Sequence, residues 1–281
     1  MANPTIITNT TDTTPSPHWL TCQLSAAGIA TITLNRPDKH NAFDDHLIQL
    51  FIAQLQTLAN DDTVRGLIIT GAGKSFSAGA DLAWMQRMAD YDEAANLADA
   101  EQLALLLHLL DSFPKPTLAL VNGAAFGGAV GLIACCDSVI SADNASFCLS
   151  EVRIGLIPAV ISPFVVNKIG ISWSRHLMTS AVVFTANQAL TYGLAHQIVA
   201  LSELNSAKDQ WITVTLGNSP EAVAQIKQLL QVFNSHLPVA KENLATTTAH
   251  TTTAIAKIRV SLNGQAGLKA FLTKTPAPWK E

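Results

Sequence analysis

Two glycine-rich segments and the glutamate that follows them, Glu151, carry the residue types needed to move a proton beside a carbonyl group. The segments are residues 71–82 and 121–131, and each lies between an apolar, strand-like run and a helix-like run. Small residues let a substrate carbonyl approach the backbone, and unpaired N–H groups at a helix start favour negative charge. The amides of Ala80 and Gly128 could therefore both point at one oxygen atom.

Glu151 is the candidate proton carrier. It lies in the apolar stretch 147–154, where burial would raise its pKa and suit it to proton transfer near neutral pH. Two amide donors and one carboxylate are enough to form an enolate and move a proton. Each part also has a simpler interpretation. The glycines also suit tight turns and close helix–sheet packing, and a glutamate at a strand end also faces water or pairs with a neighbour such as Arg153.

Several familiar motifs fail on spacing. The run 73–75 reads Gly-Lys-Ser, but a phosphate-binding loop would also need glycine at position 68, which is isoleucine. A dinucleotide fingerprint starting at Gly71 would need glycine at position 76, which is phenylalanine. The histidines form no zinc-binding pattern and the four cysteines form no CxxC pair, so we expect no metal site.

The composition predicts extensive burial. Hydrophobic residues make up 48% of the 281 residues and charged residues only 14%, which favours apolar surface buried partly between subunits. The net charge is −4 and no basic tract is present, so we expect no nucleic-acid partner. The most apolar windows, 103–110 and 130–136, are far shorter than the roughly 20 residues of a membrane-spanning helix. Unpaired thiols without redox spacing fit a cytoplasmic protein.

The order of elements predicts an α/β fold of stacked strand–loop–helix units with mostly parallel strands. A predicted helix over 44–59 places Leu47, Phe51, Leu55 and Leu58 on one face. The other expected elements are a hairpin over 19–24 and 28–34, strands over 65–70, 117–122 and 137–142, and helices over 82–113, with a break near Asp90, and 127–136.

The ends of the chain differ in character from the centre. Residues 1–18 are rich in Thr, Pro and Asn and have no Lys or Arg, so we expect a disordered tail without a secretory or transit signal. Residues 19–205 form the predicted core. Residues 206–281 are expected to be helical, with a helix start at 219–221, an Ala/Thr-rich helix over 239–262 and a further helical run at 267–271.

Taken together, these motifs resemble the crotonase superfamily of enoyl-CoA hydratases and isomerases. The matching pieces cover 19–281 in order: Asn35-Arg36-Pro37, Asn41-Ala42, residues 76–82, Val121-Asn122-Gly123, Gly127-Gly128, Cys136-Asp137, Glu151 and residues 155–158. The resemblance implies a β/α spiral core and a helical C-terminal region that builds homotrimers or homohexamers. It also implies a CoA thioester as substrate, with no separate cofactor, whose carbonyl binds the amides of Ala80 and Gly128.

The same resemblance implies a place for CoA itself. Ala78, Gly79, Asp81 and Leu82 would lie beside the CoA adenine. Lys274 matches a lysine that reaches the CoA phosphate from a neighbouring subunit.

One departure bears on the reaction. Well-known hydratases of the family carry two glutamates, and the first of these positions is Gly131 here. Gly131 combined with residues 151–163 resembles the bacterial methylglutaconyl-CoA hydratase branch of leucine degradation. We therefore expect reversible hydration of a branched 2-enoyl-CoA by Glu151 alone, with Arg87 a candidate partner for a distal carboxylate. A Δ3,Δ2-enoyl-CoA isomerase and a non-catalytic acyl-CoA-binding protein remain the alternatives.

Overall fold

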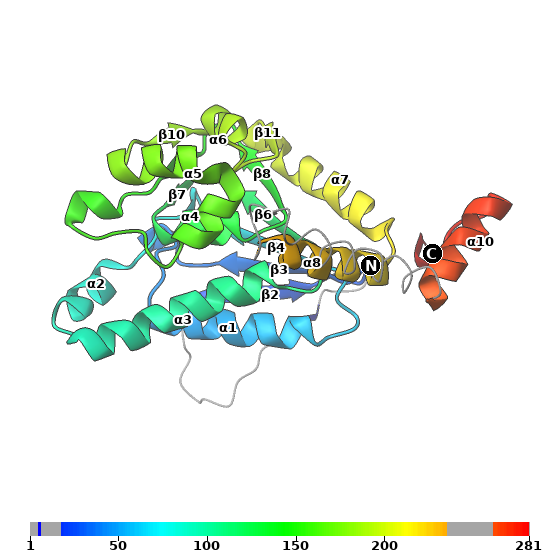
Figure 1. Ribbon diagram of the computed structural model, residues 1–281, viewed down its shortest axis with the longest axis horizontal. Helices are drawn as coiled ribbons and strands as arrows, with labels where there is room; N and C mark the ends of the chain where they lie inside the picture. Colours follow the sequence, from blue (N-terminus) through cyan, green and yellow to red (C-terminus); the bar gives the residue numbers. More distant parts are fainter. Residues whose placement is uncertain (1–4, 7–17, 235–260, 281) are drawn as a thin grey trace, which may run out of the picture.

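Two β-sheets frame the protein in this computed structural model, which describes residues 5–6, 18–234 and 261–280 (Figure 1). The larger sheet has the strand order β1-β2-β3-β4-β6-β8-β11, and the smaller has the order β10-β9-β7-β5. The strands of the larger sheet are β1 (Thr5–Ile6), β2 (Leu20–Leu24), β3 (Ile29–Leu34), β4 (Gly66–Gly71), β6 (Thr117–Val121), β8 (Ser138–Ala142) and β11 (Gln197–Val199). Those of the smaller sheet are β5 (Ser75–Ser77), β7 (Ala124–Phe126), β9 (Ser146–Cys148) and β10 (Phe184–Thr185).

The chain passes between the sheets in a repeating way, as expected for a β/α spiral. It adds β4, β6 and β8 to the larger sheet, and after each of them it adds β5, β7 or β9 to the smaller one. Pairing is parallel from β3 to β11 in the larger sheet and from β5 to β9 in the smaller one. The expected α/β class with mostly parallel strands is therefore confirmed.

The central strands of the larger sheet are buried on both faces. All five residues of β6 are buried, as are five of the six in β4, which is typical of parallel strands covered on both sides. Ile69 of β4 lies between Ile32 of β3 and Ala119 of β6. These apolar runs fix the register, because a slip by one residue would turn each side chain to the opposite face.

Helices α1 (Asp45–Ala59) and α3 (Glu93–Asp111) lie side by side along the larger sheet (Figure 1). The Asp44 carboxylate caps α1 by accepting the Leu47 amide at 2.9 Å. The four apolar residues predicted to share one face of α1 are all buried. The predicted helix break near Asp90 is confirmed, since α2 (Leu82–Ala89) ends there and the Asp92 carboxylate caps α3.

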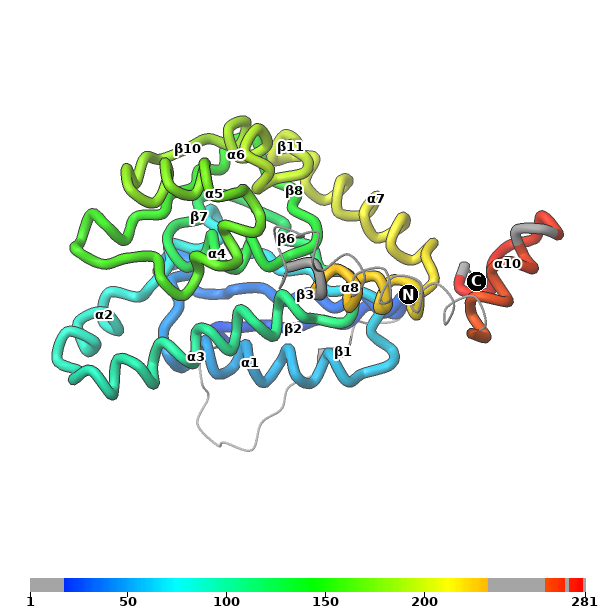
Figure 2. Tube along the Cα trace, viewed as in Figure 1, coloured from blue at the N-terminus to red at the C-terminus, as the bar shows by residue number. Residues whose placement is uncertain are grey.

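The second half of the chain is mainly helical. It contains α4 (Gly128–Ala134), α5 (Ser162–Ser180), α6 (Ala186–Tyr192), α7 (Leu204–Leu216), α8 (Pro220–Asn234) and α10 (Leu262–Thr273). Figure 2 shows α10 set apart from the two sheets, at the opposite end of the long axis from α2. Within the described residues, no helix is long and apolar enough to cross a membrane.

The structure describes only part of two segments for which the sequence makes predictions. Most of the Ala/Thr-rich stretch 239–262 lies outside the described residues, and so does most of the segment 1–18. Within that N-terminal segment Thr5–Ile6 form β1, which pairs antiparallel with β2. The strands of the smaller sheet were not expected, because runs of two or three residues are too short to show a periodic pattern.

Candidate active site

Three chain segments meet where β5, β7 and β9 end. These strands are parallel neighbours with β7 in the middle, so their carboxyl ends lie at one edge of the smaller sheet. Gly79 and Ala80 follow β5, Gly127 and Gly128 follow β7, and Glu151 follows β9. The structure therefore brings together the three residues to which the sequence assigns chemistry. The carboxyl edge of a parallel sheet is also a common place for ligands.

The backbones of these segments lie in close contact. A methyl group on Gly79 would lie 2.7 Å from the carbonyl oxygen of Phe126, and one on Gly127 would lie 3.3 Å from Glu151 Oε1. Both glycines also have positive φ angles, 89° and 55°. Any side chain at either position would be strained, so the glycines are needed for the close approach itself.

The Ala80 amide donates no hydrogen bond to any described residue, although the residues on either side of it are both bonded to Phe43. On either side of it, the Phe43 amide donates to the Gly79 carbonyl at 2.8 Å, and the Asp81 amide donates to the Phe43 carbonyl at 2.9 Å. Within the described residues, the Ala80 N–H itself has no acceptor. A donor held in place by its neighbours and left unbonded is suited to receive a substrate oxygen.

The Gly128 amide is free for a different reason. Gly128 is the first residue of α4, so its N–H has no partner inside the helix. The amide before it donates to the Cys148 carbonyl at 2.8 Å, which fastens the helix start to β9. No acceptor for the Gly128 N–H is found in the part of the chain that the structure describes. The Phe43 ring packs against Gly128, where an added Cβ would lie 2.7 Å from the ring.

Glu151 presents a half-buried carboxylate to this edge. Its Oε2 atom is buried and has no hydrogen-bond partner among the described residues. Burial raises the pKa of Glu151 above its usual value of 4.5, and its own backbone amide offsets part of this effect. A carboxyl with a raised pKa transfers protons more effectively near neutral pH than an exposed glutamate does.

An apolar side chain fills the space beside position 131, the first of the two family glutamate positions. A Cβ on Gly131 would lie 2.4 Å from Ile161 Cγ2 and 3.6 Å from a methyl of Leu107. Ile161 is buried, with 2% of its surface exposed, and α4 carries no acidic residue. Of the two family positions, only Glu151 therefore offers a carboxylate.

The four residues expected beside the CoA adenine differ in what they expose. Ala78 and Leu82 are exposed, Leu82 by 77%, whereas Gly79 and Asp81 are buried. The Asp81 carboxylate caps α2 through the Ala83 amide at 2.8 Å and pairs with Arg36 at 2.9 Å. Only Ala78 and Leu82 thus offer free surface to a ligand, and Asp81 holds the segment in shape.

Lys274 is not brought to the site of its own chain. It is exposed and follows α10, which lies at the far end of the molecule from α2 (Figure 1). Arg87 is also committed elsewhere, since it pairs with Asp45 on the surface. Within the described residues, no group of three or more His, Cys, Asp or Glu side chains is placed to hold a metal ion.

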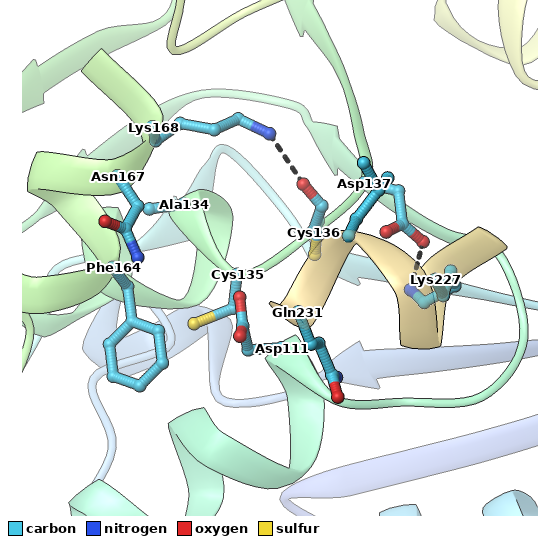
Figure 3. Close-up of a pocket in the computed structure, with 11 residues that line it drawn as sticks. Asp111, Ala134, Cys135, Cys136, Asp137, Phe164, Asn167, Lys168, Lys227 and Gln231 are labelled. Atoms are coloured by element: carbon cyan, nitrogen blue, oxygen red, sulfur yellow. Dashed lines mark hydrogen bonds and ion pairs between the residues drawn. The ribbon is translucent and has the colours of Figure 1, made fainter. Parts of the chain in front are cut away.

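A cavity of about 270 Å³ lies at the other end of α4 (Figure 3). Lys168 donates to the Cys136 carbonyl there at 2.7 Å, and Lys227 of α8 forms an ion pair with Asp137. These bonds fasten α5 and α8 to the core. The cavity is separate from the sheet edge that carries Glu151.

Sequence reasoning missed two residues around the Ala80 amide, Phe43 and Arg36. Arg36 entered the sequence analysis only as part of the motif Asn35-Arg36-Pro37, and Phe43 was assigned no role. An arginine followed by Pro37 and then by Asn41-Ala42 gives no local sign that it will be buried.

Comparison with known proteins agrees with this architecture. Residues 25–281 match the family described as enoyl-CoA hydratase/isomerase. The chain is similar to the crystal structure of an enoyl-CoA hydratase from Shewanella pealeana, with a TM-score of 0.88 and 45% identity, covering 93% of this chain and 96% of that one. It is 32% identical to the 2,3-dehydroadipyl-CoA hydratase of Escherichia coli. It is 31% identical to the trans-2-decenoyl-acyl-carrier-protein isomerase of Streptococcus mutans. Each of these last two matches covers 72% of this chain and 78% of the relative.

Proposed function

Because the chain belongs to the enoyl-CoA hydratase/isomerase family, we propose that it adds water reversibly to a 2-enoyl-CoA thioester. One observation carries this proposal. Two unbonded backbone amides and one half-buried carboxylate, with its Oε2 atom unbonded, meet at the same edge of the smaller sheet. That set suits a reaction in which negative charge develops on a carbonyl oxygen while a proton moves nearby.

In the proposed mechanism, the Ala80 and Gly128 amides donate hydrogen bonds to the thioester oxygen. Glu151, ionised, takes a proton from water as the water oxygen bonds to C3. The π electrons of the C2–C3 double bond move toward the thioester, and the enolate oxygen is held by the two amides. Glu151 then returns a proton to C2, which restores the carbonyl and leaves Glu151 ionised for the next turnover.

We propose a branched acyl group, of the 3-methylglutaconyl-CoA type found in leucine degradation. Support comes from the sequence pattern of Gly131 with residues 151–163. Arg87 is paired with Asp45, and the Arg153 guanidinium donates to the Ala181 carbonyl, so a distal carboxylate would have to compete for either cation. Rates on straight, branched and carboxylated enoyl-CoA esters, compared side by side, test this choice.

We also propose that the protein works as a homotrimer or a homohexamer. Apolar side chains beside the site are left exposed in a single chain, among them Leu82, Leu156 and Ile157, at 77%, 53% and 73%. Such a patch commonly marks an interface or a ligand surface. Lys274 would then serve the CoA phosphate of a neighbouring subunit. The mass of the particle in solution tests the assembly.

Replacing Glu151 by glutamine tests the assigned role most directly. Loss of a general acid–base group commonly lowers kcat by about 10²–10⁴-fold. We expect that loss for Glu151→Gln, followed by the decay of the conjugated enoyl-thioester absorbance, with affinity for the CoA ester nearly unchanged. Glu203→Gln, on the exposed surface, is the matched control. Near-normal hydration by Glu151→Gln contradicts the assignment.

The isomerase alternative has its own supporting observation. Ile161 fills the space at position 131, which leaves Glu151 as the single carboxylate of the two family positions. Shifting a double bond from C3 to C2 needs one base to carry a proton between C2 and C4, and it needs no water. Uptake of ¹⁸O from labelled water into product indicates hydration, whereas conversion of a 3-enoyl ester without uptake indicates isomerisation.

The third alternative is a non-catalytic acyl-CoA-binding protein. It would require Glu151 to lie away from the two amides. The Glu151 carboxylate instead lies beside Gly127, directly before the Gly128 amide, which weighs against this alternative.

A further inference from the structure

A three-bond strip sets the direction of the Ala80 amide. It joins residues 40–43 to residues 78–81 through the Ala78 amide and the His40 carbonyl at 2.9 Å, and through the two bonds of Phe43 that flank Ala80. The Ala80 N–H itself donates to no acceptor among the described residues. The direction of the Ala80 N–H bond therefore depends on how firmly residues 40–43 and 78–81 are held together.

Arg36 holds both sides at once. Its Nη1 donates to the Ala42 carbonyl and its Nη2 to Asp81 Oδ2, each at 2.9 Å. Ala42 belongs to one side of the strip and Asp81 directly follows Ala80 on the other. The guanidinium is buried, with about 10% of the side chain exposed, and lies 4.2 Å from the centre of the Trp19 ring. A planar guanidinium can make two such directed bonds together, whereas a lysine ammonium presents a single nitrogen.

Asp81 connects Arg36 to the start of α2. Its Oδ1 accepts the Ala83 amide at 2.8 Å, so the same carboxylate caps α2 and binds Arg36. Burial raises the pKa of Asp81, but the Ala83 amide and the Arg36 guanidinium outweigh this and leave the pKa below its usual value. The carboxylate therefore stays ionised and keeps both attachments.

We propose that Arg36 is a positioning residue, which fixes the Ala80 amide in line with the thioester oxygen by clamping Ala42 and Asp81 together. This inference rests on the proposed function, because it assigns Arg36 a part in holding the donor that the reaction uses. Arg36 does not touch substrate in this arrangement. Its effect on the reaction passes through the Ala80 N–H.

The chain offers a matched control for a clamp that only stabilises the fold. Lys227 is a cation paired with the Asp137 carboxylate (Figure 3). It is buried, with 9% of its side chain exposed. Asp137 follows α4, whereas Gly128 begins it, so this pair lies at the end of α4 away from the site. Lys227→Met removes a buried charge as Arg36→Met does, without touching the strip around Ala80.

The test compares Arg36→Met, Arg36→Lys and Lys227→Met with the wild type in its native assembly. Steady-state kinetics separate kcat from KM, and a bound 2,4-dienoyl-CoA reports polarisation of its thioester as a red shift in absorbance. Because a misplacement of about 1 Å can cost about 10²-fold, we expect kcat to fall about 10–100-fold in Arg36→Met, with KM within about threefold. The red shift should shrink in that variant. Arg36→Lys should fall between it and the wild type.

Lys227→Met should keep the wild-type kcat and the full red shift. A full red shift with wild-type kcat in both Arg36 variants overturns the clamp and leaves the proposed function standing. If the wild type itself gives no red shift, the oxyanion role fails and the clamp fails with it. Should Arg36→Met not fold, Arg36→Lys decides, since it keeps the charge and changes only the bonding pattern.

Discussion

Placing a glutamate at position 131 tests whether the site is built for one carboxylate. Gly131 lies in α4, and a Cβ there would sit 2.4 Å from Ile161 Cγ2 and 2.8 Å from Ile161 Cβ. Ordinary contacts between carbon atoms are about 3.5–4.0 Å. Gly131→Glu must therefore push Ile161 aside before its carboxylate reaches any position.

The expected loss of stability follows from three terms. Overpacking of this kind costs about 1–3 kcal/mol. Replacing glycine within a helix returns at most about 1 kcal/mol. A carboxylate in this buried place also loses hydration, so it would bind a proton or displace its neighbours. The net loss of about 2 kcal/mol corresponds to a Tm lower by roughly 3–4 °C for a chain of 281 residues.

Urea unfolding and hydration rates, measured on matched variants, separate these terms. Gly131→Ala carries the same Cβ clash without the carboxylate. Ile161→Gly removes both clashing atoms, whereas Ile161→Val keeps them. We expect Gly131→Glu to be less stable than the wild type and no faster in hydration. Adding Ile161→Gly to Gly131→Glu should cost less than the sum of the two single changes, and adding Ile161→Val should bring no such recovery.

One result would refute this reasoning. A Gly131→Glu protein that unfolds at the same urea concentration as the wild type, and hydrates faster, would mean that Ile161 yields without cost. The single-carboxylate arrangement would then not be built into the packing.

Three further predictions concern burial at the site and in the core. Burial raises the pKa of Glu151, so the free energy of unfolding of the wild type should fall as the pH rises above 4.5, the usual pKa of a glutamate. Glu151→Gln should therefore resist urea better than the wild type at pH 8 but not below pH 4. An advantage of the variant only in acid would contradict this. For the same reason, kcat/KM should fall in acid with an apparent pKa above 4.5, which a pH–rate profile measures. Burial raises the pKa of Cys22 to about 11 and that of Cys136 to about 12, so a thiol reagent at pH 8 should label them only after unfolding. Rapid labelling of the folded protein would show that they are accessible.

The long elements could be predicted because their periodicity is strong. The four apolar residues on one face of α1 recur over three turns, and all four are buried. Asp90 and Asp92 end one helix and begin the next, as residues that favour caps do. A pattern of this length predicts its helix well because the apolar residues that make the pattern are the same residues that the fold buries.

The smaller sheet could not be predicted by the same means. β5, β7 and β9 have three residues each, which is too few to distinguish a strand from a loop. They pair with one another because β4, β6 and β8, the neighbouring strands of the larger sheet, bring the segments that follow them side by side. The sequence did indicate the residues at their ends, because glycines before helix starts have a local signature of their own.

The packing around those ends was equally hidden from the sequence. Ile161 lies thirty positions after Gly131, yet it decides what position 131 can hold. Arg36 is a charged residue directly before a proline, with no local sign of burial, yet it becomes a buried bridge to Asp81. Contacts between distant segments depend on the final fold, and no local propensity reports them.

These two hidden residues control different halves of the proposed chemistry. Arg36 acts on the oxygen side, because the Ala80 amide can stabilise an enolate only while its direction is fixed. Ile161 acts on the carbon side, because it fills the space that a side chain at position 131 would need and leaves Glu151 as the one carboxylate of the two family positions. Hydration by this site therefore needs Glu151 to carry a proton from water to C2, and isomerisation needs it to carry a proton from C2 to C4. Both reactions use the same amides, so the choice between them depends on whether a water molecule can lie between Glu151 and C3.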